Sequence, residues 1–268
     1  MMIIDKHVHT PYCPHGSTDP LERYIERAIS LGYREISFTE HAPLPENFID
    51  PTPEKDSAMA LDQMPAYLEE LGKLKAYYSS ALKVNIGLEV DFIEGYEKET
   101  SSFLDQYGPL LDDSILSVHF LRSGEAYYCM DYSEETFEEM IRMFGGLTKV
   151  YEAYFSTLKK SIVTDLGTYK PSRIGHITLV EKFKRKFPHD RDLSAYVMPI
   201  LDIMSDKKCE LDYNGAGFTK PLCLDSYPPA FIALEAHKRK IPLVYGSDAH
   251  SAKGLMQGYN QLERTLLD

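Results

Sequence analysis

The chain has 268 residues, of which 43% are hydrophobic and 26% charged, an ordinary composition for a soluble globular protein. The net charge is −12, and the densest basic stretch is confined to residues 182–191. Proteins that bind nucleic acid usually carry a basic face, so this charge balance argues against nucleic acid as a partner. No run approaches 18 apolar residues and no signal-peptide core precedes the first charges, so we expect no membrane span and a cytoplasmic location. Four widely separated cysteines exclude a disulfide framework or a zinc finger.

Short apolar runs alternate with amphipathic segments along the whole chain, which is typical of repeated β-α units. The first helix is predicted to begin with Asp19 as its cap and Pro20 in its first turn, and to end at Gly32. Seven strands are predicted at residues 2–9, 35–41, 83–93, 114–121, 172–179, 209–214 and 242–250. Further helices are predicted near residues 58–80, 134–161, 192–206, 228–239 and 256–266.

The remaining segments do not divide the chain. Residues 43–56 are rich in proline and predict a long loop, and residues 124–132 predict an extra hairpin or a loop. No repeat or flexible linker is present, so we expect one domain over residues 1–268. Seven strands, each followed by a helix or a long excursion, fit a closed or nearly closed parallel barrel, whose functional residues lie at the carboxyl ends of the strands.

Histidines gather at these strand ends. Seven of the nine lie at, or just past, the carboxyl end of a predicted strand. A single strand histidine is most simply a satisfied core residue, but seven at one rim, with carboxylates among them, predict a metal centre. His7 and His9 are two residues apart on a strand and therefore point to the same side. The candidate ligands are His7, His9, His15, His41, Glu89, His119, His176, Asp248 and His250.

Ligands of this kind favour Zn²⁺, Mn²⁺ or Fe²⁺. A catalytic zinc ion usually takes three or four protein ligands, so nine candidates predict two or three ions that share a carboxylate. Adjacent ions lower the pKa of a bridging water and stabilise the attacking and leaving oxygens of a displacement at phosphorus. The sequence therefore favours hydrolysis of a phosphate ester.

Six short motifs then carry a family resemblance. They are HVH at 7–9, TEH at 39–41, GLEVD at 87–91, SVH at 117–119, GHI at 175–177 and GSDAH at 246–250. Each motif is weak, but their order and completeness resemble the polymerase-and-histidinol-phosphatase (PHP) superfamily over residues 5–250. HTPYCPHGS and SFTEHAPLP resemble its histidinol-phosphate phosphatase branch. The resemblance implies an α/β fold, a distorted (βα)₇ barrel of the PHP type, with a trinuclear metal centre.

The resemblance also implies how the ligands are divided among three ions, with Glu89 shared by two of them. One ion is held by His7, His9, Glu89 and Asp248. A second ion is held by Glu89, His119 and His176. A third ion is held by His15, His41 and His250. Cys13 lies inside the opening histidine cluster, and its role stays open.

The implied reaction is hydrolysis of L-histidinol phosphate to L-histidinol and phosphate, in histidine biosynthesis. A metal-bridging hydroxide beside Glu89 attacks phosphorus, and the third ion binds the phosphate and stabilises charge in the transition state. The leaving alkoxide needs a proton, for which Asp248 and His250 are both candidates. Glu89, Asp248 and His250 are accordingly the expected catalytic residues.

Substrate contacts beyond the ions are predicted at three residues. Arg191 follows the fifth strand on the active rim, and a planar guanidinium suits phosphate oxygens. Asn214 ends the sixth strand at the same rim, although an Asn-Gly turn explains it equally well. Glu40, like Asp91, either attracts the cationic amine or imidazole of the substrate or orients a metal-bound histidine. Arg173 begins the fifth strand at the opposite rim and is predicted to be structural.

Other functions could use some of the same residues. The same centre would suit a phosphatase or phosphodiesterase acting on another small phosphate ester or a nucleotide. A carbon–nitrogen hydrolase of the amidohydrolase type also uses barrel-rim histidines, but typically with a bridging lysine, and no lysine lies at a strand end here. A non-catalytic domain would be expected to lack ligands, and none is missing. The sequence leaves the oligomeric state open.

Overall fold

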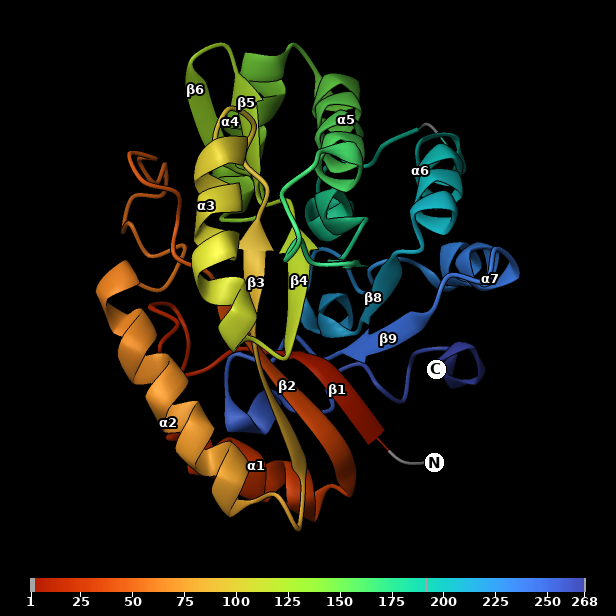
Figure 1. The fold of residues 1–268 in the computed structure, drawn as a ribbon. Coiled ribbons are helices and arrows are strands. Elements are labelled where there is room, and N and C mark those ends of the chain that lie inside the picture. Colours follow the sequence, from red (N-terminus) through yellow and green to blue (C-terminus); the bar gives the residue numbers. More distant parts are fainter. Residues whose placement is uncertain (1–2, 191, 268) are drawn as a thin grey trace.

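Seven parallel strands form the centre of the computed structural model, which describes residues 3–190 and 192–267 (Figure 1). The sheet order is β1-β2-β3-β4-β7-β8-β9, and Val8 pairs with Ala249 to join its two edges beside the site. The predicted parallel, nearly closed barrel is therefore confirmed. The strands are β1 (Ile3–Val8), β2 (Tyr33–His41), β3 (Lys83–Asp91), β4 (Asp113–Ser117), β7 (Arg173–Ile174), β8 (Glu210–Asn214) and β9 (Leu243–Gly246).

Helices lie around the outside of this barrel (Figure 1). They are α1 (Leu21–Ser30), α2 (Met64–Tyr77), α3 (Glu97–Tyr107), α4 (Glu134–Phe144), α5 (Leu147–Val163), α6 (Ser194–Lys207) and α7 (Ala230–Lys238). Helix α1 buries a stripe of apolar residues at helical spacing and stops before Gly32, as predicted. Asp19 does not cap it. Its carboxylate instead accepts hydrogen bonds from Arg23 (2.6 Å) and from the backbone N–H of Ala252 (3.1 Å).

Three helix predictions need correction. The single helix predicted at residues 134–161 is broken at Gly145 and Gly146, whose φ angles of 86° and 129° suit glycine. Residues 256–266 form turns and only a short 3₁₀ helix (Arg264–Leu266) instead of an α-helix. Helix α3 was not predicted, because it is polar and buries only Thr100 and Leu104.

Three strands end several residues earlier than predicted, and the one expected at residues 242–250 stops at Gly246, so that Asp248 and His250 lie past its end. The strand expected at residues 114–121 ends at Ser117, and the chain then forms the antiparallel hairpin β5 (Phe120–Ser123) and β6 (Ala126–Cys129). The strand expected at residues 172–179 has only the two residues of β7. His119 and His176 therefore lie in irregular backbone just past the strands, where the chain can turn their side chains towards the barrel axis.

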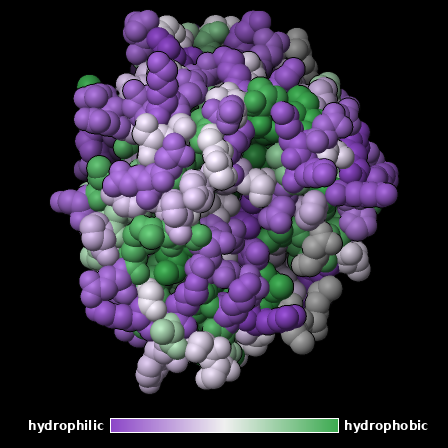
Figure 2. All heavy atoms as spheres, viewed as in Figure 1, coloured by the Kyte–Doolittle hydropathy of each residue, from purple (hydrophilic) through white to green (hydrophobic). Residues whose placement is uncertain are grey.

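The surface and the cysteines complete the description of the fold. The face in Figure 2 is mostly hydrophilic, with exposed apolar side chains in separate small groups. No helix within residues 3–190 and 192–267 is long and apolar enough to cross a membrane. All four cysteines are buried and free, as predicted.

Candidate metal centre

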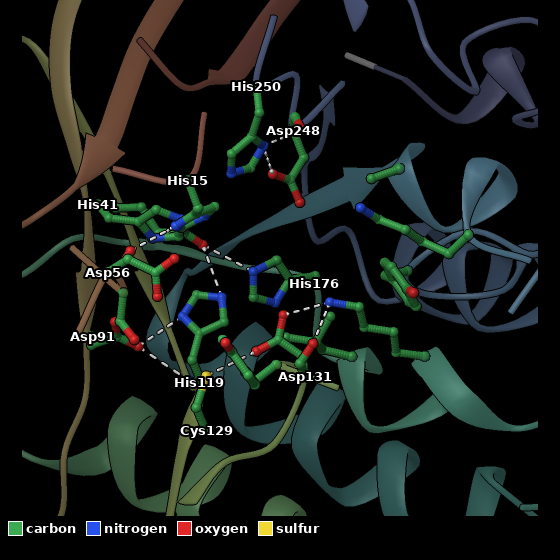
Figure 3. A pocket seen from close by; sticks show the side chains of 18 of the residues that line it. His15, His41, Asp56, Asp91, His119, Cys129, Asp131, His176, Asp248 and His250 are labelled. Carbon is green, nitrogen blue, oxygen red and sulfur yellow. Dashed lines mark hydrogen bonds and ion pairs between the residues drawn. The ribbon is translucent and has the colours of Figure 1, made fainter. Parts of the chain in front are cut away.

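All nine predicted ligands meet at the carboxyl end of the barrel. His7 and His9 are fully buried at its floor. The other seven line a cavity of about 460 Å³ (Figure 3), together with polar and aromatic residues from the loops. The seven are His15, His41, Glu89, His119, His176, Asp248 and His250.

Glu89 occupies the middle of the cluster. Its Oε2 atom lies 3.3 Å from His7 Nε2 and 3.5 Å from His9 Nε2. Its Oε1 atom lies 2.9 Å from His176 Nε2 and 3.8 Å from His119 Nε2. His41 Nδ1 also lies 3.2 Å from Oε2. The two carboxylate oxygens thus face different sets of histidines, an arrangement suited to a carboxylate shared by two ions.

The first two predicted ligand sets are compact. Two groups of donor atoms contain Glu89, and the atoms within each lie within 4.8 Å of one another. The groups are His7, His9, Glu89 and Glu89, His119, His176. Asp248, the remaining member of the first set, places Oδ1 3.2 Å from His9 Nε2 and 3.9 Å from His7 Nε2. Asp248 has a φ of 54°, in the left-handed region, where an aspartate is more tolerated than most residues.

The third predicted set is looser and has an additional neighbour. The rings of His41 and His250 lie 5.2 and 5.1 Å from that of His15. His41 and His250 also form a group with His9 and the buried thiol of Cys13, all with donor atoms within 4.8 Å of one another. Cys13, whose role the sequence left open, therefore borders the metal centre.

Most of these histidines are oriented by a second hydrogen-bonding group. Three are bonded through Nδ1 to buried carboxylates: His7 to Asp212 (2.9 Å), His9 to Glu40 (3.2 Å) and His119 to Asp91 (2.8 Å). Two are bonded through Nδ1 to backbone carbonyls: His15 to that of Asp56 (2.7 Å) and His250 to that of Asp248 (3.1 Å). A proton held on Nδ1 leaves the Nε2 lone pair free to bind an ion.

Two predicted substrate contacts are buried outside the lining of the cavity, which for Glu40 favours the alternative of orienting a histidine. Glu40 is fully buried and does not line the cavity; besides His9, it accepts a hydrogen bond from the backbone N–H of Thr10 (2.7 Å). Asn214 is also fully buried, and its Nδ2 donates to Asp212 (3.1 Å) and Asp248 (3.2 Å). Both residues position ligands. Arg191, the third predicted contact, lies outside the described residues.

Sequence reasoning missed three polar residues. Asp212, behind His7, alternates with Asn214 along β8, and this spacing of two was the available signal. Asp131 follows the β5–β6 hairpin, and Lys182 belongs to a 3₁₀ helix (Leu179–Phe183). Both line the cavity, and no local pattern identifies either of them.

Two motif glycines provide space for the polar groups behind the ligands. A Cβ atom on Gly246 would lie 2.2 Å from Oδ1 of Asp212. A Cβ atom on Gly175 would lie 2.1 Å from Oγ of Ser117, the hydroxyl that donates to Glu89 (2.6 Å). The glycines of GSDAH and GHI are therefore needed for close packing beside the ligands.

Positive charge is stabilised at some of these histidines and disfavoured at others, since burial and the nearby His9 hold the pKa of His41 and of His250 well below the usual range. Burial alone would lower the pKa of His9, but the adjacent carboxylates of Asp248 and Glu40 outweigh burial and raise that pKa to about 9. Burial likewise opposes protonation of His119, yet the adjacent Asp91 helps to raise its pKa to about 10. A cation that enters this cluster meets carboxylates already placed to neutralise it.

The donor atoms fit divalent transition-metal ions. Among the described residues, four buried imidazole nitrogens of the candidate ligands have no hydrogen-bond partner: His7 Nε2, His9 Nε2, His41 Nδ1 and His176 Nδ1. The first three lie within 3.5 Å of Glu89 Oε2. Buried polar atoms are normally hydrogen-bonded, so unpaired ones around a shared carboxylate indicate ligands. Imidazole and carboxylate donors suit Zn²⁺, Mn²⁺ and Fe²⁺.

A cluster of this kind at the carboxyl end of a parallel barrel defines a metal-dependent hydrolase. Residues 5–216 match the family model of the PHP domain. The chain therefore belongs to the PHP family, which confirms the resemblance of its motifs.

Relatives of known name extend this result. The chain is 48% identical to histidinol-phosphatase of Bacillus subtilis, over 97% of this chain and 98% of the relative. The structure of a candidate histidinol phosphatase from Listeria monocytogenes has a TM-score of 0.93 and 38% identity, covering 97% of this chain and 99% of the other. The fold is also shared with histidinol phosphate phosphatase of Lactococcus lactis, solved with zinc, L-histidinol and phosphate. That match has a TM-score of 0.66 and 20% identity, over 99% and 94% of the two chains.

Proposed function

We propose that this protein hydrolyses L-histidinol phosphate to L-histidinol and inorganic phosphate, as one domain acting in the cytoplasm. The observation that carries the chemistry is the position of Glu89, whose two oxygens face different sets of histidines among the nine candidate ligands. The choice of substrate is supported by the 48% identity to the Bacillus subtilis histidinol-phosphatase.

The proposed cofactors are two or three divalent ions of zinc, manganese or iron. Glu89 would be shared between an ion at His7, His9 and Asp248 and an ion at His119 and His176. A third ion would be held by His15, His41 and His250. When bound, such ions neutralise phosphate charge, lower the pKa of water and stabilise the transition state.

The protein's own groups orient the ligands and shape the cavity. Asp212, Glu40 and Asp91 hold imidazole rings in place, which keeps their free nitrogens directed at the centre. Lys220 lines the cavity and would supply positive charge for a phosphate dianion, whereas Lys182 is paired with Asp131. Asp248 and His250 also line it, and the proton for the leaving alkoxide is proposed to come from one of them.

The test is phosphate release from L-histidinol phosphate by the purified protein, with metal content measured on the same sample. We expect rapid release with two or three ions per chain, and much slower release from p-nitrophenyl phosphate and a dinucleotide. Bound metal with faster release from another ester would contradict the proposed substrate. Activity that survives thorough metal removal would contradict the mechanism.

A further inference from the structure

Asp131 is a cavity carboxylate without a role in the metal centre described above. Among the described carboxylates of the cavity wall, Glu89 and Asp248 belong to the ligand set and Asp91 orients His119. The Asp56 carboxylate accepts a hydrogen bond from Thr52 Oγ1 (3.4 Å), and the backbone carbonyl of Asp56 orients His15. Asp131 has no hydrogen bond to a histidine in the described part of the chain. It nevertheless interacts electrostatically with His119 and His176, close to which it lies in Figure 3.

The Asp131 carboxylate is held rigidly but retains acceptor capacity. Lys182 Nζ lies 2.9 Å from Oδ2 and also donates to the backbone carbonyl of Asp131. Oδ1 accepts only a weak bond from the Cys129 thiol, at 3.5 Å. A carboxylate offers about four lone-pair sites, so further donors can be accommodated. The Asp131 side chain is 22% exposed, and it reaches solvent at the cavity.

The Asp131 carboxyl is stabilised in its ionised form. Burial alone would raise the pKa of its carboxyl, but the Lys182 ammonium and the nearby His119 outweigh burial and hold the pKa well below its usual range. An ionised carboxylate beside a centre that binds phosphate suits a substrate with both charges. Aromatic and apolar side chains also line the cavity: Phe120, Tyr132, Leu179 and Tyr227.

L-Histidinol phosphate has this combination of groups. Its ammonium is carried by the second carbon from the ester oxygen, and its imidazole lies one carbon further away. We propose that Asp131 receives the substrate ammonium, and that Lys182 fixes the carboxylate in position. This assignment rests on the proposed function and makes Asp131 a specificity-determining residue. It explains how the site would select an amino alcohol phosphate over an uncharged one.

The experiment compares two substrates that differ only in the amine: L-histidinol phosphate and its deamino analogue, 3-(imidazol-4-yl)propyl phosphate. A charge-assisted hydrogen bond corresponds to about a 10- to 100-fold preference in kcat/KM for the amine substrate. In Asp131→Asn we expect this preference to be lost, while the deamino analogue is hydrolysed within about threefold of the wild-type rate. Asp131→Glu, which keeps the charge, should retain part of the preference.

The matched control is Asp225→Asn. Asp225 pairs with Lys184 (2.8 Å), which follows the same 3₁₀ helix as Lys182, but neither residue of this pair lines the cavity. This variant should keep the preference for the amine. Metal content is measured on all three variants, because a change in the ions would slow both substrates equally.

The outcomes separate the two proposals. Equal slowing of both substrates by Asp131→Asn, with the preference retained, would overturn the role of Asp131. Equal hydrolysis of both substrates by the wild-type protein would also overturn it, and this comparison needs no variant to fold. Failure to hydrolyse either imidazole phosphate, with another ester accepted, would overturn the proposed function itself.

Discussion

The two ends of the barrel both bury polar side chains, but they differ in which charged groups are buried and in what lies beside them. At the amino end, Arg173 is 1% exposed and lies 3.0 Å from Asp113 and 3.6 Å from Glu210. It also donates to the backbone carbonyl of Lys6 (3.1 Å), and Lys6 faces Glu35 at 3.5 Å. Each cation there has an anion of the protein beside it, as the structural role predicted for Arg173 requires.

At the carboxyl end, histidine nitrogens surround Glu89, and several of those described have no hydrogen-bond partner in the protein. Burying an unpaired polar group costs free energy, so a stable protein concentrates such groups only where another partner binds them. Unpaired atoms alone do not separate the two ends, because Nε and Nη1 of the buried Arg173 also lack a hydrogen-bond partner among the described residues. The ends differ in the kind of group: a permanent cation lies beside carboxylates at the amino end, whereas imidazole nitrogens that can bind an ion gather around Glu89 at the carboxyl end. Substitutions at the two ends should separate stability from metal binding.

The largest effect is expected for Glu89→Ala. This variant removes a ligand from two proposed ions, so we expect fewer ions per chain and a loss of phosphate release of about 10³-fold or more. Metal analysis and a phosphate assay on the same sample provide the measurement. Glu94→Gln, at a residue paired with Lys160 (2.5 Å) away from the centre, should keep both values. Full metal content with a near-normal rate would contradict the shared carboxylate.

At the opposite end, Arg173→Met should lower the free energy of unfolding by about 3–5 kcal/mol, because it leaves Asp113 without its buried partner. Urea unfolding measures this loss, and the folded variant should bind ions normally. Lys83→Met is the matched control. Lys83 also faces a carboxylate of this end, Glu35 at 3.2 Å, but is 64% exposed, so the change should stay within about 0.5 kcal/mol. Equal losses would show that the network gains nothing from burial.

A smaller effect is expected for Asp212→Asn, which keeps the size of the side chain but weakens its hydrogen bond to His7. Removing such an orienting partner lowers metal affinity or activity by about 10- to 100-fold. Titration with a competing chelator measures the affinity. Asp202→Asn, at an exposed residue paired with Arg239 (2.8 Å), should leave it unchanged. Unchanged affinity in Asp212→Asn would show that packing alone orients His7.

Local patterns were enough to predict the barrel and the residues that gather at its carboxyl end. Side chains two residues apart on a strand, such as His7 and His9, point to the same side. The carboxyl ends of parallel strands meet at one rim of the barrel. The identities of the nine candidate ligands therefore followed from their positions in the chain. The order of the motifs was sufficient to indicate the family.

Only the tertiary structure decided what lies behind and beside those ligands. The early ends of β4 and β7 and the break at Gly145 depend on backbone packing that the spacing of apolar residues does not indicate. The pairing of Asp131 with Lys182 joins two loops 51 residues apart. Likewise, Glu40 and Asn214 have the residue types of substrate contacts but are fully buried. Sequence spacing determines which way a side chain leaves its own strand, whereas burial and partners depend on what the other strands place opposite it.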